Sequence, residues 1–176
     1  MTEPTFISDK VKDQVILVLR SFFADQPKYT WLADSNETKV IIADKYSYEL
    51  EAVEQRPIIS VQRGAIRPFG RHIGHFRGSD LRAVDSFVEA FRVDFVVLCL
   101  SRVGLEAETL AQLVFQFIMR YRSKLREKGF LDIKASSLGE ERIAKSDSKI
   151  DISVVPVTIS VEITDSWSVI DNVPEA

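Results

Sequence analysis

The sequence predicts one α/β domain of the α+β type: a mixed, mostly antiparallel sheet with an N-terminal helix and one long helix packed on it. Three observations indicate this fold. Two segments repeat apolar residues every three or four positions, one segment alternates apolar with polar residues, and one is continuously apolar. The chain has 176 residues, of which 45% are hydrophobic. A chain of this length buries a core without disulfides or metals, so residues 1–176 are expected to form a single domain.

The first expected element is a helix over residues 8–24. Its apolar residues recur at helical spacing: Val11, Val15, Val18 or Leu19, and Phe22. Pro27 follows, and proline cannot continue a helix. Two short strands are expected next, at residues 39–43 and 57–63, because both are rich in β-branched residues and the second is followed by glycine.

Residues 64–80 interrupt these patterns and are predicted to form a long Arg/Gly-rich loop, because they contain four glycines and Pro68. Loops of this length in a compact domain are usually functional or disordered. Three interpretations remain open: a solvated face, a subunit interface rich in arginine and aromatic residues, or a contact with a phosphate backbone. The candidate contact residues are Arg63, Arg67, Phe69, Arg71, His72, His75, Phe76 and Arg77.

The second half of the chain predicts a buried strand at residues 91–101 and a long helix at residues 105–128. The strand is continuously apolar, which is typical of a central position. Acidic residues near the start of the helix and basic residues near its end complement the helix dipole. The expected core stripe is Leu110, Leu113 or Val114, Phe117, Tyr121 and Leu125. Phe115, Ile118 and Met119 widen the apolar face, which indicates either burial on more than one side or a subunit interface.

The last expected strand covers residues 152–164. Its apolar residues alternate strictly with the others: Val155, Val157, Ile159, Val161 and Ile163. This period of two predicts one buried face. Pro156 indicates an edge near the start of the strand, since proline cannot donate to a ladder. Residues 166–176 are expected to form a polar C-terminal tail, in which Trp167 indicates docking on another surface.

Composition excludes several classes of protein. The net charge of −3 is too small for bulk nucleic-acid binding, so any basic surface must be local. The single cysteine, Cys99, lies in an apolar run and is expected to be buried and inert. The N-terminus lacks the pattern of a signal peptide, and no apolar run reaches the ~18–20 residues of a membrane span. We therefore expect no membrane partner and assembly in the cytoplasm.

One short constellation resembles the site of a metal-dependent nuclease. Asp34, Glu37 and Lys39 precede an apolar run, and in such sites carboxylates hold a divalent cation while a lysine orients water. A solvated turn that leads into a strand is the alternative interpretation. His72 and His75 are the only histidines, and a zinc site needs three or four ligands. We expect no catalytic residue, metal or cofactor, and thus a protein that is not an enzyme.

Four segments together resemble a family. They are an Arg-Pro-Ile-Ile-Ser-Val-x-Arg-Gly stretch at residues 56–64, an apolar strand that ends in Ser-Arg at 101–102, a Leu-Glu-Ala-Glu-Thr-Leu-Ala helix at 105–111, and a Val-Pro-Val-Thr-Ile strand at 155–159. The chain resembles a tail-terminator or neck protein of tailed bacteriophages over residues 10–167.

The resemblance implies a structural virion protein. Proteins of this family are small α/β proteins that form a hexameric ring on a completed tail tube, stop its growth and offer a docking surface to the head-completion protein. DNA passes through the central hole, and the family has no catalytic residues. The expected partners are therefore other copies of this chain, the tail tube protein, the head-completion or connector protein, and DNA in the channel. The expected location is the neck of the virion, reached through the host cytoplasm.

Three other functions remain open at this stage. One is a head-completion adaptor or a baseplate-side protein of the same particle. Another is the metal-dependent nuclease of Asp34, Glu37 and Lys39. The last is a nucleic-acid-binding module that uses the arginines between Arg56 and Arg82, whose affinity would fall steeply with salt.

Overall fold

The computed structural model describes residues 7–34, 36–44, 56–68, 75–79, 84–127, 130–145 and 151–170. Within these residues the chain forms helices and strands in a mixed order. The helices are α1 (Ile7–Ala24) and α2 (Gly104–Arg126), and the strands are β1 (Ile41–Asp44), β2 (Ile58–Pro68), β3 (His75–Ser79), β4 (Val84–Ser101), β5 (Asp132–Leu138), β6 (Arg142–Lys145) and β7 (Asp151–Ile170).

The described strands form one sheet with the order β1-β2-β4-β7-β5, while β3 pairs with β4 and β6 pairs with β7. Only the β1–β2 pair is parallel among these described pairs, and the others are antiparallel. The predicted fold class is therefore confirmed: a single α+β domain has a mostly antiparallel sheet, an N-terminal helix and one long helix.

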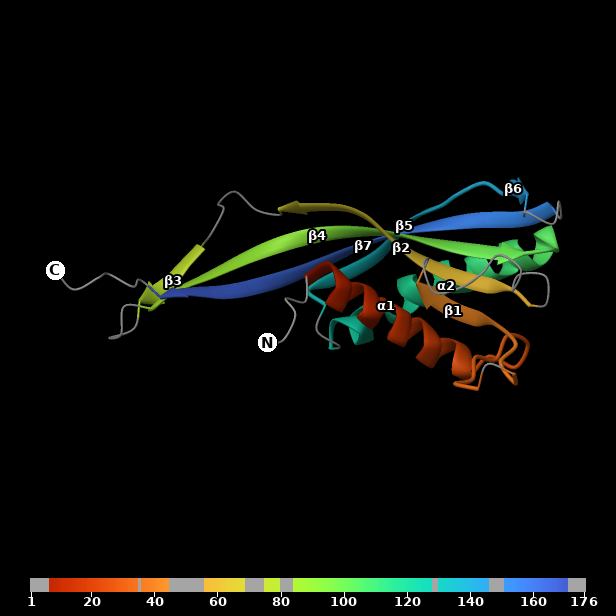
Figure 1. Ribbon diagram of the computed structural model, residues 1–176, viewed down its shortest axis with the longest axis horizontal. Coiled ribbons are helices and arrows are strands. Elements are labelled where there is room, and N and C mark those ends of the chain that lie inside the picture. Colours follow the sequence, from red (N-terminus) through yellow and green to blue (C-terminus); the bar gives the residue numbers. More distant parts are fainter. Residues whose placement is uncertain are drawn as a thin grey trace.

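The centre of the sheet is a long ribbon made of β4 and β7. The two strands pair without a register shift from Val84 opposite Ile170 to Ser101 opposite Ser153. Figure 1 shows that both helices lie beside one half of this ribbon, whereas the half that carries β3 projects beyond them. The molecule is thus elongated, with a helix-packed body at one end and the part of the ribbon that carries β3 at the other.

Both helices pack on one side of the sheet, which we call the covered face. Alternate residues of β4 and β7, from Val93 to Cys99 and from Val155 to Ile163, point into this core. α1 contributes Val11, Val15, Ile16, Leu19 and Phe23, and α2 contributes Ala107, Leu110, Ala111, Val114, Phe117, Ile118 and Leu125. Each large side chain buried in this way stabilises the fold by roughly 1.5–3 kcal/mol relative to leaving it exposed.

Two residues of the expected helix stripes lie elsewhere. Phe23 is buried where Phe22 was expected, since Phe23 follows Leu19 by one helical turn. Phe22 instead turns toward α2 and stacks on Phe117, with ring centroids 4.2 Å apart and an interplanar angle of 17°. Tyr121 is 42% exposed, although it was expected in the core. Both differences arise where the two helices face each other rather than the sheet.

The other side of the sheet, which we call the opposite face, carries the remaining alternate residues. A small apolar cluster of Ile58, Leu100 and Ile152 lies on it. Arg92 and Glu162 also lie on this face, opposite each other in the register.

The prediction of a loop over residues 64–80 is wrong for the part that the structure describes. Residues 64–68 continue β2, and residues 75–79 form β3. Both segments pair with β4, which satisfies backbone donors and acceptors whatever the side chains are. Residues 69–74 and 80 lie outside the described part of the chain.

The C-terminal tail was also placed too early. Residues 166–170 belong to β7, where Trp167 lies opposite Phe87 of β4. The long-range pairing with β4 extends the strand beyond the alternating segment that predicted it. Residues 171–176 lie outside the described part.

Pro156 lies at a local gap along one side of β7. β5 pairs with residues 157–162 and β6 with residues 151–154. The N–H of Gly139, just past the end of β5, donates to the Pro156 carbonyl at 2.8 Å. The nitrogen and carbonyl of one strand residue point to the same side, so the missing N–H of Pro156 faces this gap between β5 and β6. The expected edge at Pro156 therefore corresponds to a break in the neighbouring strand.

Candidate interaction surface

The eight candidate contact residues fall along one edge of the ribbon or outside the described residues. Arg63 and Arg67 lie on the exposed half of β2, and the backbone of residues 75–77 lies in β3. β2 and β3 pair with the same edge of β4, since Pro68 lies opposite Phe91 and His75 opposite Val88. The side chains of His75, Phe76 and Arg77, and the whole of Phe69, Arg71 and His72, are outside the described part.

A β-bulge separates the buried and exposed halves of β2. The register shifts between Arg63 and Ile66, so that Gly64 and Ala65 oppose Asp94 alone. A Cβ on Gly64 would lie 3.0 Å from the carbonyl oxygen of Asp94, so the strands approach closely at this point. Residues 58–61 before the bulge are buried, and residues 63–68 after it are exposed.

A row of charged residues crosses the opposite face of the sheet. In register, it runs from Arg67 on β2 through Arg92 on β4 and Glu162 on β7 to Asp132 on β5. Arg92 donates to Glu162 from Nε at 3.2 Å and from Nη2 at 2.6 Å. Like charges directly opposite each other are unfavourable, and the Glu162 carboxylate offsets the Arg67–Arg92 repulsion.

The row ends at an ion-pair cluster between β5 and α2. Both oxygens of Asp132 accept hydrogen bonds from Arg122, and Arg126 Nη2 donates to Asp132 Oδ1 at 3.1 Å. These hydrogen bonds, foremost those from Arg122, lower the pKa of the Asp132 carboxyl from 3.8 to about 2. The same contact raises the pKa of the Arg122 guanidinium. The cluster joins the end of α2 to an edge strand.

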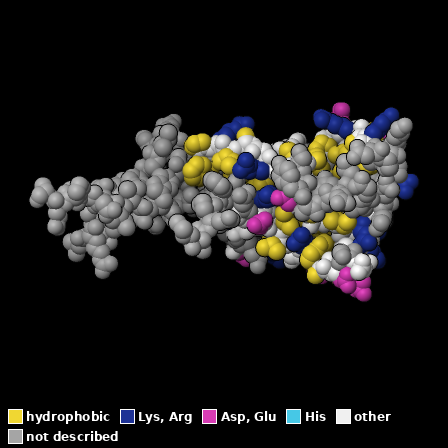
Figure 2. Space-filling model, in the orientation of Figure 1, with side chains coloured by type: hydrophobic (Ala, Val, Ile, Leu, Met, Phe, Trp, Pro, Cys, Tyr) yellow, Lys and Arg dark blue, Asp and Glu magenta, His cyan; other side chains and the backbone are white. Residues whose placement is uncertain are grey.

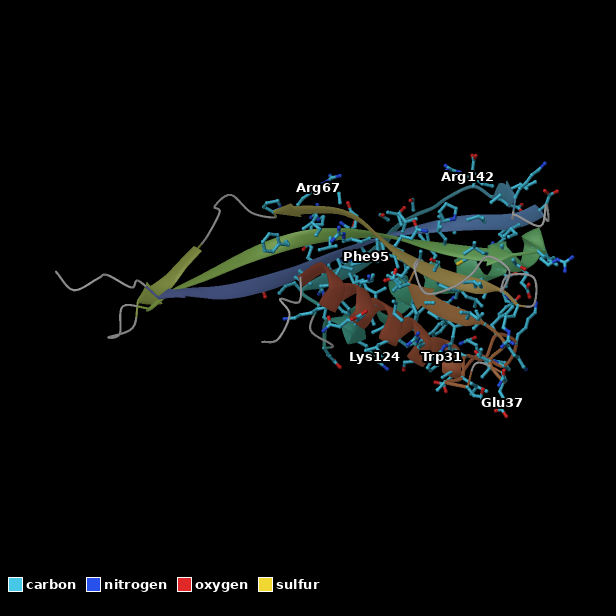
Figure 3. All side chains as sticks on the ribbon, in the orientation of Figure 1. Trp31, Glu37, Arg67, Phe95, Lys124 and Arg142 are labelled. Carbon is cyan, nitrogen blue, oxygen red and sulfur yellow. The ribbon has the colours of Figure 1, made fainter. Side chains whose placement is uncertain are left out.

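The nuclease-like residues lie in a turn and are engaged there in separate ways. Asp34 Oδ1 accepts the N–H of Asn36 at 2.8 Å, and the Lys39 ammonium group donates to the Pro27 carbonyl at 3.2 Å. Glu37 is exposed at a corner of the molecule far from Arg67 (Figure 3). In the part of the chain that the structure describes, no three His, Cys, Asp or Glu side chains are grouped to hold a metal ion.

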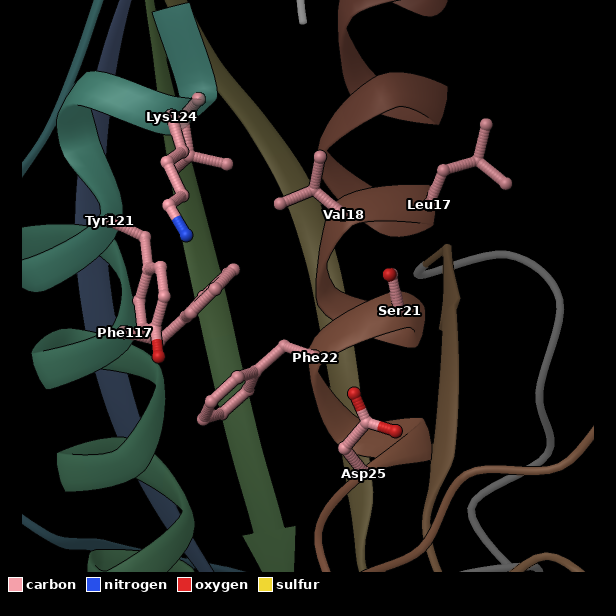
Figure 4. Close-up of a pocket in the computed structure, with 9 residues that line it drawn as sticks. Leu17, Val18, Ser21, Phe22, Asp25, Phe117, Tyr121 and Lys124 are labelled. Atoms are coloured by element: carbon pink, nitrogen blue, oxygen red, sulfur yellow. The ribbon is translucent and has the colours of Figure 1, made fainter.

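A groove lies between the two helices, at a position that the sequence predictions did not give. It has a volume of about 400 Å³. Figure 4 shows the Phe22 and Phe117 rings between the helices, with Val18 above them and Tyr121 and Lys124 on the α2 side. Lys124 Nζ lies 5.7 Å from the Tyr121 ring centroid. The lining residues, which define the interhelical groove, are Leu17, Val18, Ser21, Phe22, Asp25, Phe117, Tyr121, Lys124 and Leu125.

The sequence carried a partial signal for this groove. The wide apolar face of the long helix left burial on several sides or a subunit interface open. Ile118 is fully buried, whereas Met119 is 50% exposed, so the helix is covered by the sheet and α1 but not all round. The position of α1 beside α2 decides where the groove opens, and helix periodicity does not reveal that position.

A second exposed apolar set lies where α2 begins. Leu105 is 75% exposed, Ile143 on β6 is 70% exposed and Val103 is 57% exposed. Ile143 and Ser101 both lie opposite Ser153 of β7, and a Cβ on Gly104 would meet the Glu141 carboxylate. These contacts bring the start of α2 and β6 to the same end of the molecule. We call Val103, Leu105 and Ile143 the apolar end.

Basic side chains are spread over the described surface. Figure 2 shows lysines and arginines at several separate places on this face rather than in one continuous patch. No helix in the described residues is long and apolar enough to cross a membrane. The chain matches no protein-family model, and no curated protein sequence matches it.

Proposed function

We propose that this chain is a structural virion protein, a tail terminator that forms a ring on the phage tail tube and joins the tail to the head. The proposal combines the resemblance of residues 10–167 to tail-terminator and neck proteins with the form of the molecule. Its carrying observation is the β4–β7 ribbon, which continues beyond the helix-packed body (Figure 1).

A projecting ribbon suits an assembly protein. Backbone pairing along its whole length keeps it extended, while the helices stabilise only the half that lies in the body. Such an arm lengthens the surface that one subunit offers to its neighbours without enlarging its core. The candidate contact residues Arg63 and Arg67 lie on an exposed strand at the edge of this ribbon, where neighbouring subunits or passing DNA would meet them.

Particles assembled without this chain test the proposal. Electron micrographs are expected to show overlong or unjoined tails, because nothing stops tube growth or offers the head a docking surface. Addition of the purified chain is expected to restore tails of uniform length. Heads that leak DNA beside tails of normal length would instead indicate a head-completion adaptor.

Oligomeric state gives a second test. Light scattering of the purified chain, alone and mixed with tail tubes, is expected to show a ring of several subunits, six by resemblance. A protein that stays monomeric in both conditions would contradict the ring.

DNA contact through phosphates is expected to weaken steeply with added salt.

The competing nuclease hypothesis has a direct test. We expect plasmid incubated with the chain and Mg²⁺ to stay intact, because Asp34 and Lys39 make separate contacts within their turn. Cleavage that the Glu37→Ala variant abolishes would overturn the structural role.

A further inference from the structure

This chain has one hollow apolar surface and, elsewhere, a set of exposed large apolar side chains. The interhelical groove is hollow and lies beside the second half of α2. The apolar end projects from the start of α2 and from β6. Leu105 and Tyr121 are separated by about 24 Å along α2, at 1.5 Å per residue. One subunit therefore cannot fill its own groove with its own apolar end.

The groove has room for the exposed side chains of the apolar end. An apolar cavity of about 150 Å³ accepts one benzene molecule, and the groove has about 400 Å³. Its floor, the stacked rings of Phe22 and Phe117, is apolar surface that inserted aliphatic side chains would remove from water. Leu105 and Ile143 are the two most exposed large apolar side chains in the described part of the chain.

Charges at the rims match as well. Asp25, just past the end of α1, and Lys124 on α2 lie at the groove. The Glu141 carboxylate lies against Gly104, next to Leu105 at the start of α2. The apolar end therefore offers a carboxylate to the Lys124 ammonium group at the rim of the groove. Within the described residues, no ion pair involves Asp25, Lys124 or Glu141.

We propose that the apolar end of one copy inserts Leu105 and Ile143 into the interhelical groove of the next copy. The contact joins two different surfaces, so it is a head-to-tail contact that produces a ring when the rotation between copies closes. This inference rests on the proposed function and names the interface of its ring.

Two variants separate the surfaces. Leu105→Glu combined with Ile143→Glu places carboxylates on the apolar end, and Ser21→Arg blocks the rim of the groove. All three positions are exposed, so folding is expected to persist, and Glu at the first turn of α2 favours the helix dipole. Leu131→Glu is the matched control, because Leu131 is 50% exposed but belongs to neither surface.

Sedimentation velocity distinguishes head-to-tail assembly from any symmetric contact. Each variant alone is expected to sediment as a monomer, while the control assembles like the unchanged chain. An equimolar mixture of the two variants is expected to form a one-to-one dimer, because one intact groove meets one intact apolar end. If the mixture stays monomeric, or if either variant assembles like the unchanged chain, the proposed interface is wrong.

Cross-linking locates the contact independently. The Ser21→Cys and Leu105→Cys variants are expected to form a mixed disulfide dimer under mild oxidation, while neither pairs with Leu131→Cys. Cys99 does not compete, because it is fully buried and burial raises the pKa of its thiol. Failure to form the mixed dimer contradicts the interface.

The two proposals fail in different experiments. If the chain caps tails through another surface, particles made with either variant still have tails of uniform length. This outcome contradicts the proposed interface and leaves the proposed function standing. If the two variants form the mixed dimer but particles assembled without the chain have normal tails, the interface stands and the proposed function is wrong.

Discussion

The covered and opposite faces of the sheet are built from the same two central strands, yet different interactions hold them. On the covered face, Phe95 of β4 and Ile159 of β7 are fully buried beneath the helices. On the opposite face, Arg92 pairs with Glu162, and Ser160 donates to Asp94 at 2.6 Å. The comparison teaches that burial supplies the stability of this ribbon. The polar pairs instead favour the observed register of β4 and β7 over shifted registers. A slip of one residue would turn these charges into the core.

The largest expected effect comes from a cavity on the covered face. Phe95→Ala is expected to lower the free energy of unfolding by about 3–5 kcal/mol, because a fully buried ring is lost and a cavity remains. Urea denaturation measures the change. Val96→Ala, one residue along on the opposite face and only partly buried, is the control and is expected to cost much less. Similar losses for both variants would contradict the division of roles.

Two glycine-to-alanine substitutions test how tightly the chain is packed at two positions. Gly139→Ala is expected to destabilise by about 1–3 kcal/mol, because the new Cβ would lie 2.6 Å from Cγ of the Pro156 ring. Gly104→Ala is the matched change, since its Cβ meets the flexible end of Glu141 and alanine favours a helix. In thermal denaturation, Gly104→Ala is expected to leave the melting temperature unchanged or to raise it. Equal losses of stability in the two variants would contradict the prediction that the Pro156 ring resists the new Cβ more than the Glu141 side chain does.

Acid is expected to weaken the end of the charged row. The pKa of Asp132 is lowered to about 2, so its stabilising contribution is complete above the ordinary value of 3.8 and disappears as the pH falls through 2. The loss is about 1 kcal/mol, because water screens the exposed arginines. Urea midpoints measured from pH 5 to pH 2 test this value. The Asp132→Asn variant is expected to lack this part of the pH dependence, and an unchanged slope would contradict the assignment.

The smallest expected effect is that of the central ion pair. Glu162→Gln is expected to cost below about 1 kcal/mol, because Arg92 is part-exposed and its pairing replaces contacts with water. The difference from the unchanged chain is expected to shrink further in 1 M salt. A loss as large as that of Phe95→Ala would mean that the opposite face carries stability as well as register.

Local pattern predicted the elements whose burial is regular. The helices, β1 and the alternating part of β7 agree with their segments to within a few residues, because apolar spacing reports the face that packs. The strand predicted at residues 91–101 has the correct end, but β4 begins seven residues earlier, at Val84, where it pairs with β3 and β7. β5 and β6 were missed. β5 offers only Ile133 and Ala135 as buried residues, and all of β6 is exposed, so neither has the apolar alternation of a strand.

Strand pairing was the part that the sequence could not supply. Residues 64–68 and 75–79 are strands because β4 offers them backbone partners, while their glycines and proline favour a loop. The charged row has the same origin, since Arg92 and Glu162 are 70 positions apart and meet only through the register. The groove depends on how two helices approach each other. Of the candidate contact residues, the structure places the side chains of Arg63 and Arg67 at the surface, and their role in contacts stays a prediction.

The position of β7 in the chain affects how this protein is made. β7 pairs with β4, β5 and β6, so β5 and β6 lack this partner, and one edge of β4 stays open, until β7 is synthesised. Contacts between residues so distant in sequence slow folding, because the long intervening loop must close first. A nascent chain that stops before residue 151 therefore presents α2 and the apolar strand β4 with an open edge. Ribosome-bound chains of increasing length should stay sensitive to protease until β7 emerges and then become resistant in a single step.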